Sequence, residues 1–77
     1  MRKKLIKIFS ESLKVHEKEI NDKTSPENVA SWDSLGLVTL VTAVEKIFKI
    51  KLSFEEIRRF TSFKEVYDIL NSKEEIK

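Results

Sequence analysis

The residues from 34 to 49 constrain the fold of this chain more than any others, because their apolar side chains recur at helical spacing. Glycine and proline occur only once each in the whole sequence, so little interrupts a helix. Valine and threonine are common in this segment and are weak helix formers, so packing must stabilise it. The segment therefore predicts a helix at the centre of a bundle. Its expected apolar face consists of Leu37, Leu40, Val41, Val44, Ile47 and Phe48, widened by Leu35 and Val38.

Three more segments predict helices, and serine-based capping boxes mark where the third and fourth helices begin. Ser53 is followed three residues later by Glu56, and Ser62 is followed in the same way by Glu65. A chain of 77 residues is long enough for one domain, so residues 1–77 are expected to form a single all-α four-helix bundle. Three of the four helices are substantial, and the third along the chain is short. The predicted helices cover residues 2–19, 34–49, 54–60 and 63–72.

The connection NDKTSPENVASWD, residues 21–33, is long for a helical bundle. Bundle helices are usually joined by about 2 to 8 residues. This connection contains the only proline and leads directly to Asp33 and Ser34 at the start of the second helix. A long polar loop that ends at this pair draws attention to the pair as a candidate site.

Composition limits the classes of function. The chain has no cysteine and one histidine, which excludes thiolate and multi-histidine metal sites. Its 15 basic and 13 acidic side chains give a net charge of +2, which neither demands nor excludes an anionic partner. No apolar run reaches transmembrane length, and polar residues interrupt the segment where a signal peptide needs its apolar core. We therefore expect a soluble, cytoplasmic, monomeric protein without a bound metal.

The pair Asp33-Ser34 has two interpretations. As a simple helix start, either residue is a good N-cap, worth about 0.5 to 2 kcal/mol over alanine. As a functional site, Asp33 is the cap and Ser34 occupies the first turn with its hydroxyl outside. The partial positive charge and free N–H groups of that turn favour a phosphodiester. The pair alone favours the cap, whereas the loop before it and the apolar helix after it favour a site.

From Trp32 to Leu70 the sequence resembles an acyl carrier protein. Members of that family are four-helix bundles in which an Asp-Ser-Leu triplet opens the second helix, here Asp33, Ser34 and Leu35. The resemblance continues through LVTLVTAVEKIFKIKLSFEEIRRFTSFKEVYDIL in its apolar spacing, the acidic start of the third helix and the turn into the last helix. The triplet is unspecific alone, but triplet, helix order and spacing together are fairly specific.

The resemblance implies that Ser34 carries 4′-phosphopantetheine, donated from coenzyme A by a phosphopantetheinyl transferase, and that Asp33 supports this modification. The chemistry then belongs to the thiol of the arm, so the protein is not expected to be an enzyme. Its other partners are expected to be an acyl-activating or loading enzyme and a downstream acyltransferase or synthase. The candidates for partner contact are Leu35, Thr39, Glu45 and Lys46. The candidates for lining an acyl pocket, with ordinary core packing as the alternative, are Leu40, Val44, Leu52, Ile57 and Phe60.

The sequence departs from fatty-acid carriers, which are strongly acidic. Thr39 stands where those carriers usually have a carboxylate, and Lys46 lies beside Glu45. Charge governs partner choice and association rate more than affinity. We therefore expect a specialised rather than a housekeeping fatty-acid pathway. Trp32 replaces the small residue common before the triplet, and packing of its ring against the bundle is favoured over exposure to a partner.

Other functions fit the residues to different degrees. A peptidyl or aminoacyl carrier shares the fold and the triplet, so it stays open. A helical adaptor without a prosthetic group would not need Ser34. Nucleic-acid binding is disfavoured because the short third helix begins with Glu55 and Glu56, which would face phosphates. The stretch HEKEI begins like a zinc-protease motif, but Ile20 stands where the second histidine ligand must be.

Overall fold

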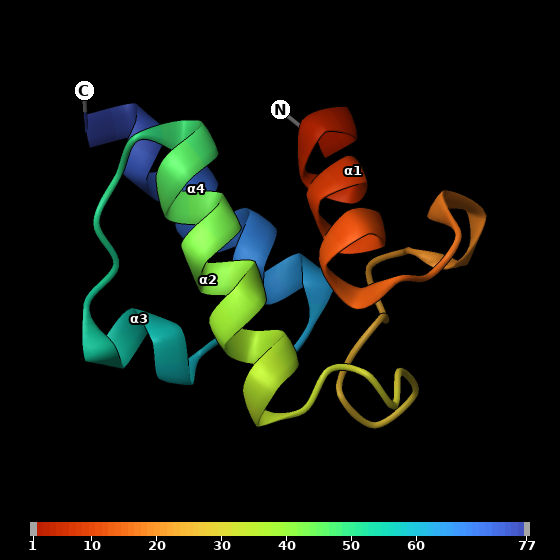
Figure 1. The fold of residues 1–77 in the computed structure, drawn as a ribbon. Coiled ribbons are helices and arrows are strands. Elements are labelled where there is room, and N and C mark those ends of the chain that lie inside the picture. The colour runs from red at the N-terminus through yellow and green to blue at the C-terminus, as the bar shows by residue number, and fades with distance from the viewer. Residues whose placement is uncertain (1, 77) are drawn as a thin grey trace.

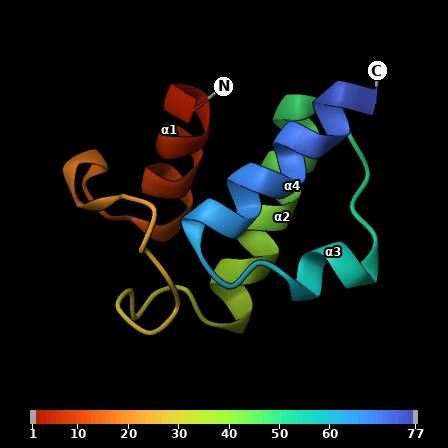
Figure 2. The ribbon, with the colours of Figure 1, turned by 180° about the vertical axis from the view of Figure 1, so that it is seen from behind.

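The computed structural model describes the backbone of residues 2–76 and the side chains of residues 2–73. Within these residues every regular element is helical, which confirms the predicted all-α class. The elements are α1 (Arg2–Leu13), the 3₁₀ turn η1 (Glu17–Glu19), α2 (Ser34–Phe48), α3 (Phe54–Arg58) and α4 (Phe63–Ile76). Figures 1 and 2 show α1, α2 and α4 packed together, with short α3 near the end of the bundle where α2 begins.

The first helix is shorter than predicted, because α1 ends at Leu13 and not near residue 19. Lys14 has a left-handed backbone, with φ of 59°, and the Val15 N–H donates to the Ser10 carbonyl at 3.2 Å. This 6→1 hydrogen bond is the Schellman pattern that ends many helices. The usual residue in the left-handed position is glycine, so the lysine gave no signal in the sequence.

The other helix ends differ from the prediction by one to four residues. Helix α2 ends at Phe48, followed by Lys49 in the left-handed region. Helix α3 ends at Arg58 because the chain tightens there, with the Phe60 N–H donating to the Ile57 carbonyl at 3.1 Å. Helix α4 continues to Ile76, four residues beyond the prediction, since the sequence contains no glycine or proline there to stop it.

The hydrophobic core centres on Phe9 of α1. Its ring meets the rings of Trp32 and Phe63 edge-on, with centroid distances of 5.3 Å and 5.0 Å. Trp32 is only 4% exposed, so the preferred interpretation, packing against the bundle, is confirmed. The buried apolar residues are Leu5, Ile8, Phe9, Leu13, Ile20, Trp32, Leu40, Val44, Phe60, Phe63, Val66, Ile69 and Leu70.

Leu35 and Val38 lie outside this core, although the sequence pattern placed them at the edge of the buried face of α2. They are 79% and 61% exposed. Periodicity shows which residues share a side of a helix, but the width of the buried side depends on how many helices pack against it. Here α1 and α4 cover only the far side of α2, so the buried side of this helix is narrower than the pattern predicts.

The long loop is fastened to the bundle through Thr24, which is 2% exposed. Its carbonyl accepts a hydrogen bond from the N–H of Phe63, the first residue of α4, at 2.8 Å. Its hydroxyl accepts from the Asn21 N–H at 2.9 Å and donates to the Glu19 carbonyl at 3.3 Å. The loop therefore caps α4 and is part of the packed structure. Among residues 2–76, no helix is both long enough and apolar enough to cross a bilayer.

Candidate functional site

Ser34 is the first residue of α2, and its side chain is exposed. The predicted N-cap at Asp33 is confirmed: its Oδ1 accepts from the Gly36 N–H at 3.0 Å, and its backbone is extended. The Asp33 carbonyl accepts from the Leu37 N–H at 2.8 Å and so starts the helical hydrogen bonding. Because the aspartate is the cap, the serine hydroxyl is left at the surface of the first turn.

Gly36 lets the start of α2 lie against the end of the long loop. A Cβ atom on this residue would be 2.1 Å from the Ser31 carbonyl oxygen and 3.1 Å from Cδ2 of Leu13. No side chain fits in that space without a movement of the backbone. Gly36 was not among the predicted site residues. Its signal was available, since a lone glycine inside a helical pattern costs about 1 kcal/mol and usually has a packing reason.

Two further contacts tie this end of α2 to α1. The Ser31 hydroxyl donates to the Leu13 carbonyl at 2.6 Å, which satisfies one of the free carbonyls at the end of α1. One residue later, the Trp32 ring packs edge-on against Phe9. These contacts, with the close approach at Gly36, determine where Ser34 lies relative to the bundle.

The surroundings of Ser34 suit attachment of a phosphate ester better than catalysis. The hydroxyl lies at the positive end of a helix of 15 residues, where a phosphodiester is favoured. None of the hydrogen bonds among the described side chains involves this hydroxyl. No group of three or more metal-ligating side chains gathers in the described part of the chain. Among the described side chains, therefore, no hydrogen bond gives the Ser34 hydroxyl a base that could activate it.

Three of the four candidates for partner contact lie on one side of α2. Leu35, Thr39 and Lys46 are all exposed, and the Thr39 hydroxyl donates to the Leu35 carbonyl at 3.0 Å. Glu45 is different, because it is half-buried and its Oε2 accepts from the Leu52 N–H at 2.9 Å. That carboxylate holds the connection between α2 and α3.

Four of the five candidates for an acyl pocket lie in or beside the core. Leu40 and Val44 are fully buried, and Phe60 is 4% exposed. Leu52 packs against the same core, and Ile57 is half-buried in α3. Their positions match ordinary core packing, which was the alternative in the sequence analysis, and the pocket role stays a prediction.

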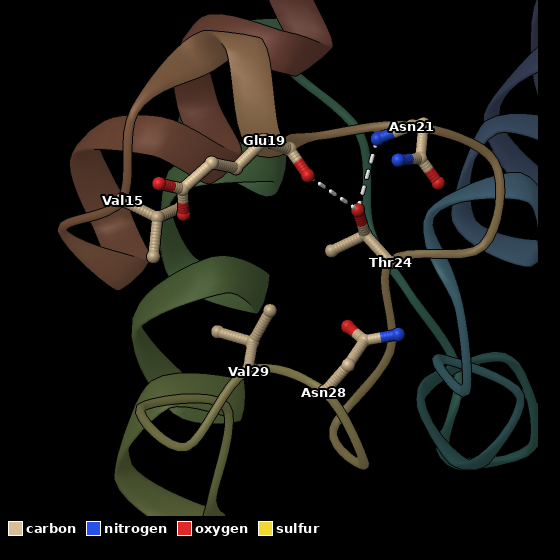
Figure 3. A pocket seen from close by; sticks show the side chains of 6 residues that line it. All are labelled: Val15, Glu19, Asn21, Thr24, Asn28 and Val29. Atoms are coloured by element: carbon tan, nitrogen blue, oxygen red, sulfur yellow. Dashed lines mark hydrogen bonds between the residues drawn. The ribbon is translucent and has the colours of Figure 1, made fainter.

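A hollow of about 190 Å³ lies elsewhere, between the end of α1 and the long loop. Figure 3 shows the Thr24 hydroxyl at its edge with hydrogen bonds to Glu19 and Asn21. None of the acyl-pocket candidates lines it. Its lining residues are Val15, Glu19, Asn21, Thr24, Asn28 and Val29.

Comparisons with known proteins identify the family of this chain. A family model described as a phosphopantetheine attachment site matches residues 3–70. The chain is 34% identical over 65 residues to an acyl carrier protein of Coprothermobacter proteolyticus, covering 84% of this chain and 79% of the relative. It is 32% identical over 73 residues to an acyl carrier protein of Buchnera aphidicola subsp. Schizaphis graminum, covering 95% and 92%.

A four-helix bundle with an exposed serine at a capped helix start, matched along most of its length by an attachment-site model, is a carrier for a covalently bound group. The chain belongs to the acyl carrier protein family. Members of this family are carriers and not enzymes, and their prosthetic group is covalently attached 4′-phosphopantetheine. The start of α2 fits that group, because an exposed hydroxyl stands there beside the positive end of a helix.

Proposed function

We propose that Ser34 is the attachment point of the 4′-phosphopantetheine arm and that the protein presents acyl groups to partner enzymes. The observation that supports this best is the position of Ser34 as the exposed first residue of α2, directly after the Asp33 cap. The thiol of the arm supplies the chemistry, since it holds acyl groups as thioesters. The chain itself supplies a tether and a surface that partner enzymes recognise.

Asp33 supports the modification of Ser34 in this proposal. Its Oδ1 is used by the Gly36 N–H, so the cap keeps the first turn of α2 formed while the serine is modified. Because the Asp33 side chain is exposed, its other oxygen is the one that a phosphopantetheinyl transferase and its Mg²⁺ would meet. The hydroxyl of Ser34 needs no base within this chain, because the transferase supplies the activating groups.

The pathway in the proposal is specialised and not housekeeping fatty-acid synthesis. The net charge of +2, the threonine at position 39 and the lysine at position 46 support it, because they leave α2 without the exposed carboxylates of fatty-acid carriers. Both relatives are acyl carrier proteins by name, which favours an acyl over a peptidyl or aminoacyl cargo. The loading enzyme and the receiving acyltransferase or synthase would be dedicated to this carrier.

The test is the intact mass of the purified chain after incubation with coenzyme A, Mg²⁺ and a broad-specificity phosphopantetheinyl transferase. We expect one phosphopantetheine group on the wild type and none on Ser34→Ala. Ser53→Ala is the matched control, since Ser53 also stands at a helix start, and it should be modified like the wild type. An unmodified wild type that is folded, or a Ser34→Ala variant that still gains the group, would refute the assignment. In the first case the chain would act as an adaptor.

A further inference from the structure

The exposed side of α2 is a continuous stripe that begins beside Ser34. Its residues follow one another at spacings of three or four along the helix, which places them on the same side. Leu35 and Val38 are 79% and 61% exposed, so the part next to the serine is apolar. Hydroxyls follow, and a lysine ends the stripe. We call Leu35, Val38, Thr39, Thr42 and Lys46 the α2 stripe.

The α2 stripe contains no carboxylate, and two of the three acidic residues of α2 and α3 serve the fold. Glu45 is the only acidic residue of α2, and its Oε2 accepts from the Leu52 N–H. On α3, Glu56 accepts from the Ser53 N–H at 2.9 Å and pairs with Lys73 at 3.1 Å. Both side chains are half-buried. Neither of these two carboxylates is therefore displayed to a docking partner.

Cations outnumber anions around the α2 stripe. None of the four ion pairs among the described side chains uses Lys46 or Arg58. Both side chains are exposed, as is Lys49, which follows α2 directly. The segment from Asp33 to Phe60 contains five basic residues, Lys46, Lys49, Lys51, Arg58 and Arg59, and four acidic residues, Asp33, Glu45, Glu55 and Glu56.

We propose that the α2 stripe is the docking surface for a partner enzyme that offers an apolar groove flanked by carboxylates. The proposal rests on the function proposed above, because the stripe matters to an enzyme only if the arm starts at Ser34. Leu35 and Lys46 are separated by a helix rise of about 16 Å. In the proposal, the carboxylates of the partner lie about 16 Å from the point where the arm enters the apolar groove.

A lipid surface fits the α2 stripe less well than a protein does. Helices that lie in a membrane interface combine a wide apolar face with several basic residues. The α2 stripe has two apolar residues, two threonines and one lysine. Small polar side chains between an apolar end and a charged end suit a protein groove with matching apolar and acidic parts.

The test uses two forms of one probe enzyme that differ only in the charge of the face that docks the carrier. One form is an acyltransferase of fatty-acid synthesis with a basic docking face, and the other is the same enzyme with those basic residues replaced by glutamate. NMR titration of the chain without its arm gives the dissociation constants. We expect the wild type to bind the glutamate form about tenfold more tightly than the basic form, with shifts along the α2 stripe and weakening by salt. Lys46→Glu should lower or invert this preference.

Lys18→Glu is the matched control, because it makes the same change of charge on exposed η1, away from α2. It should keep the wild-type preference, and Val38→Ser should weaken binding to both forms of the enzyme. Equal binding of the wild type to both forms, or equal effects of Lys18→Glu and Lys46→Glu, would overturn the proposal. Binding to phosphatidylglycerol vesicles that is lost in Val38→Ser, without a preference between the enzyme forms, would replace the protein partner by a lipid surface. The arm is absent in every titration, so failure of attachment at Ser34 cannot produce these results.

Discussion

At the start of α2, the placement of Ser34 depends on a residue that has no side chain. Gly36 allows the helix backbone to approach the Ser31 carbonyl so closely that a Cβ atom would lie 2.1 Å from its oxygen. Ser31 in turn is bonded to the end of α1 through Leu13. Ser34 is thus positioned by the contacts of Gly36, two residues after it, and of Ser31, three residues before it.

We expect Gly36→Ala to destabilise the protein by about 1 to 3 kcal/mol, the usual cost of overpacking a close contact. The sign is informative, because alanine is favoured over glycine inside a helix by about 1 kcal/mol and would otherwise stabilise the protein. The measurement is the free energy of unfolding in urea. Thr42→Ala, at an exposed position of the same helix, should be neutral or slightly stabilising. A Gly36→Ala variant more stable than the wild type would contradict the contact.

At the scale of elements, α1 and α2 both end on a lysine in the left-handed region, with φ of 59° at Lys14 and 57° at Lys49. That conformation costs a residue other than glycine about 1 to 2 kcal/mol. In each case an N–H one residue further on closes the helix, from Val15 to Ser10 and from Ile50 to Glu45. The two helices therefore stop where their last turns are satisfied, in spite of an unfavourable residue.

Lys49→Gly should therefore stabilise the protein, by about 0.5 to 1 kcal/mol. The gain is smaller than the full cost of the left-handed backbone, because glycine is also freer in the unfolded chain. Lys46→Gly, the same replacement inside α2, should destabilise by about 1 kcal/mol. Urea unfolding of both variants tests the pair, and changes of the same sign would show that the backbone conformation at Lys49 is not the cause.

Local signals predicted helix starts better than helix ends. Asp33 and Ser53 are caps as expected, because a cap is a contact between residues three apart in sequence. At Ser62 only half of the expected box forms: its hydroxyl accepts from the Glu65 N–H, while the Glu65 carboxylate pairs with Arg59 at 3.5 Å. The end of α1 was wrong by six residues, since a lysine in a glycine position has no sequence signature.

In the candidate site, too, local features could be predicted from the sequence and long-range contacts could not. The exposed Ser34 and its cap followed from the residues around them, because both depend on local geometry. The role of Gly36 needed the position of the Ser31 carbonyl, which the path of a thirteen-residue loop determines. The exposure of Val38 could be predicted only by knowing how many helices pack on α2. Long-range contacts of this kind have no periodicity that one sequence could reveal.

Across the whole molecule, contacts between distant segments make one packed unit from short helices. Phe9 joins α1 to the long loop through Trp32 and to α4 through Phe63. Arg2 repeats the connection at the surface, with an ion pair to Asp22 at 2.9 Å and its guanidinium 5.1 Å from the centre of the Phe63 ring. Helices of five to fifteen residues are marginal alone, so these contacts supply their stability.

The attachment of α3 to α4 is predicted to be sensitive to acid. The hydrogen bond from the Ser53 N–H and the nearby Lys73 ammonium hold the pKa of Glu56 below its ordinary value of 4.5. Because the folded state then binds fewer protons than the unfolded state, this contribution to stability is complete above the ordinary pKa. It is lost as the pH falls through the lowered value. The capping box and the bridge from α3 to α4 weaken together when the carboxylate is protonated.

We expect the free energy of unfolding of Glu56→Gln to fall less steeply than that of the wild type when the pH is lowered below about 4.5. Above that pH the variant should be less stable, because glutamine keeps the size of the side chain but loses the charge that pairs with Lys73. Urea unfolding at a series of pH values measures both effects. Glu55→Gln is the matched control, since its side chain is exposed one residue away. If it flattens the acid limb as much as Glu56→Gln, general charge on α3 and not the bridge to α4 would explain the acid sensitivity.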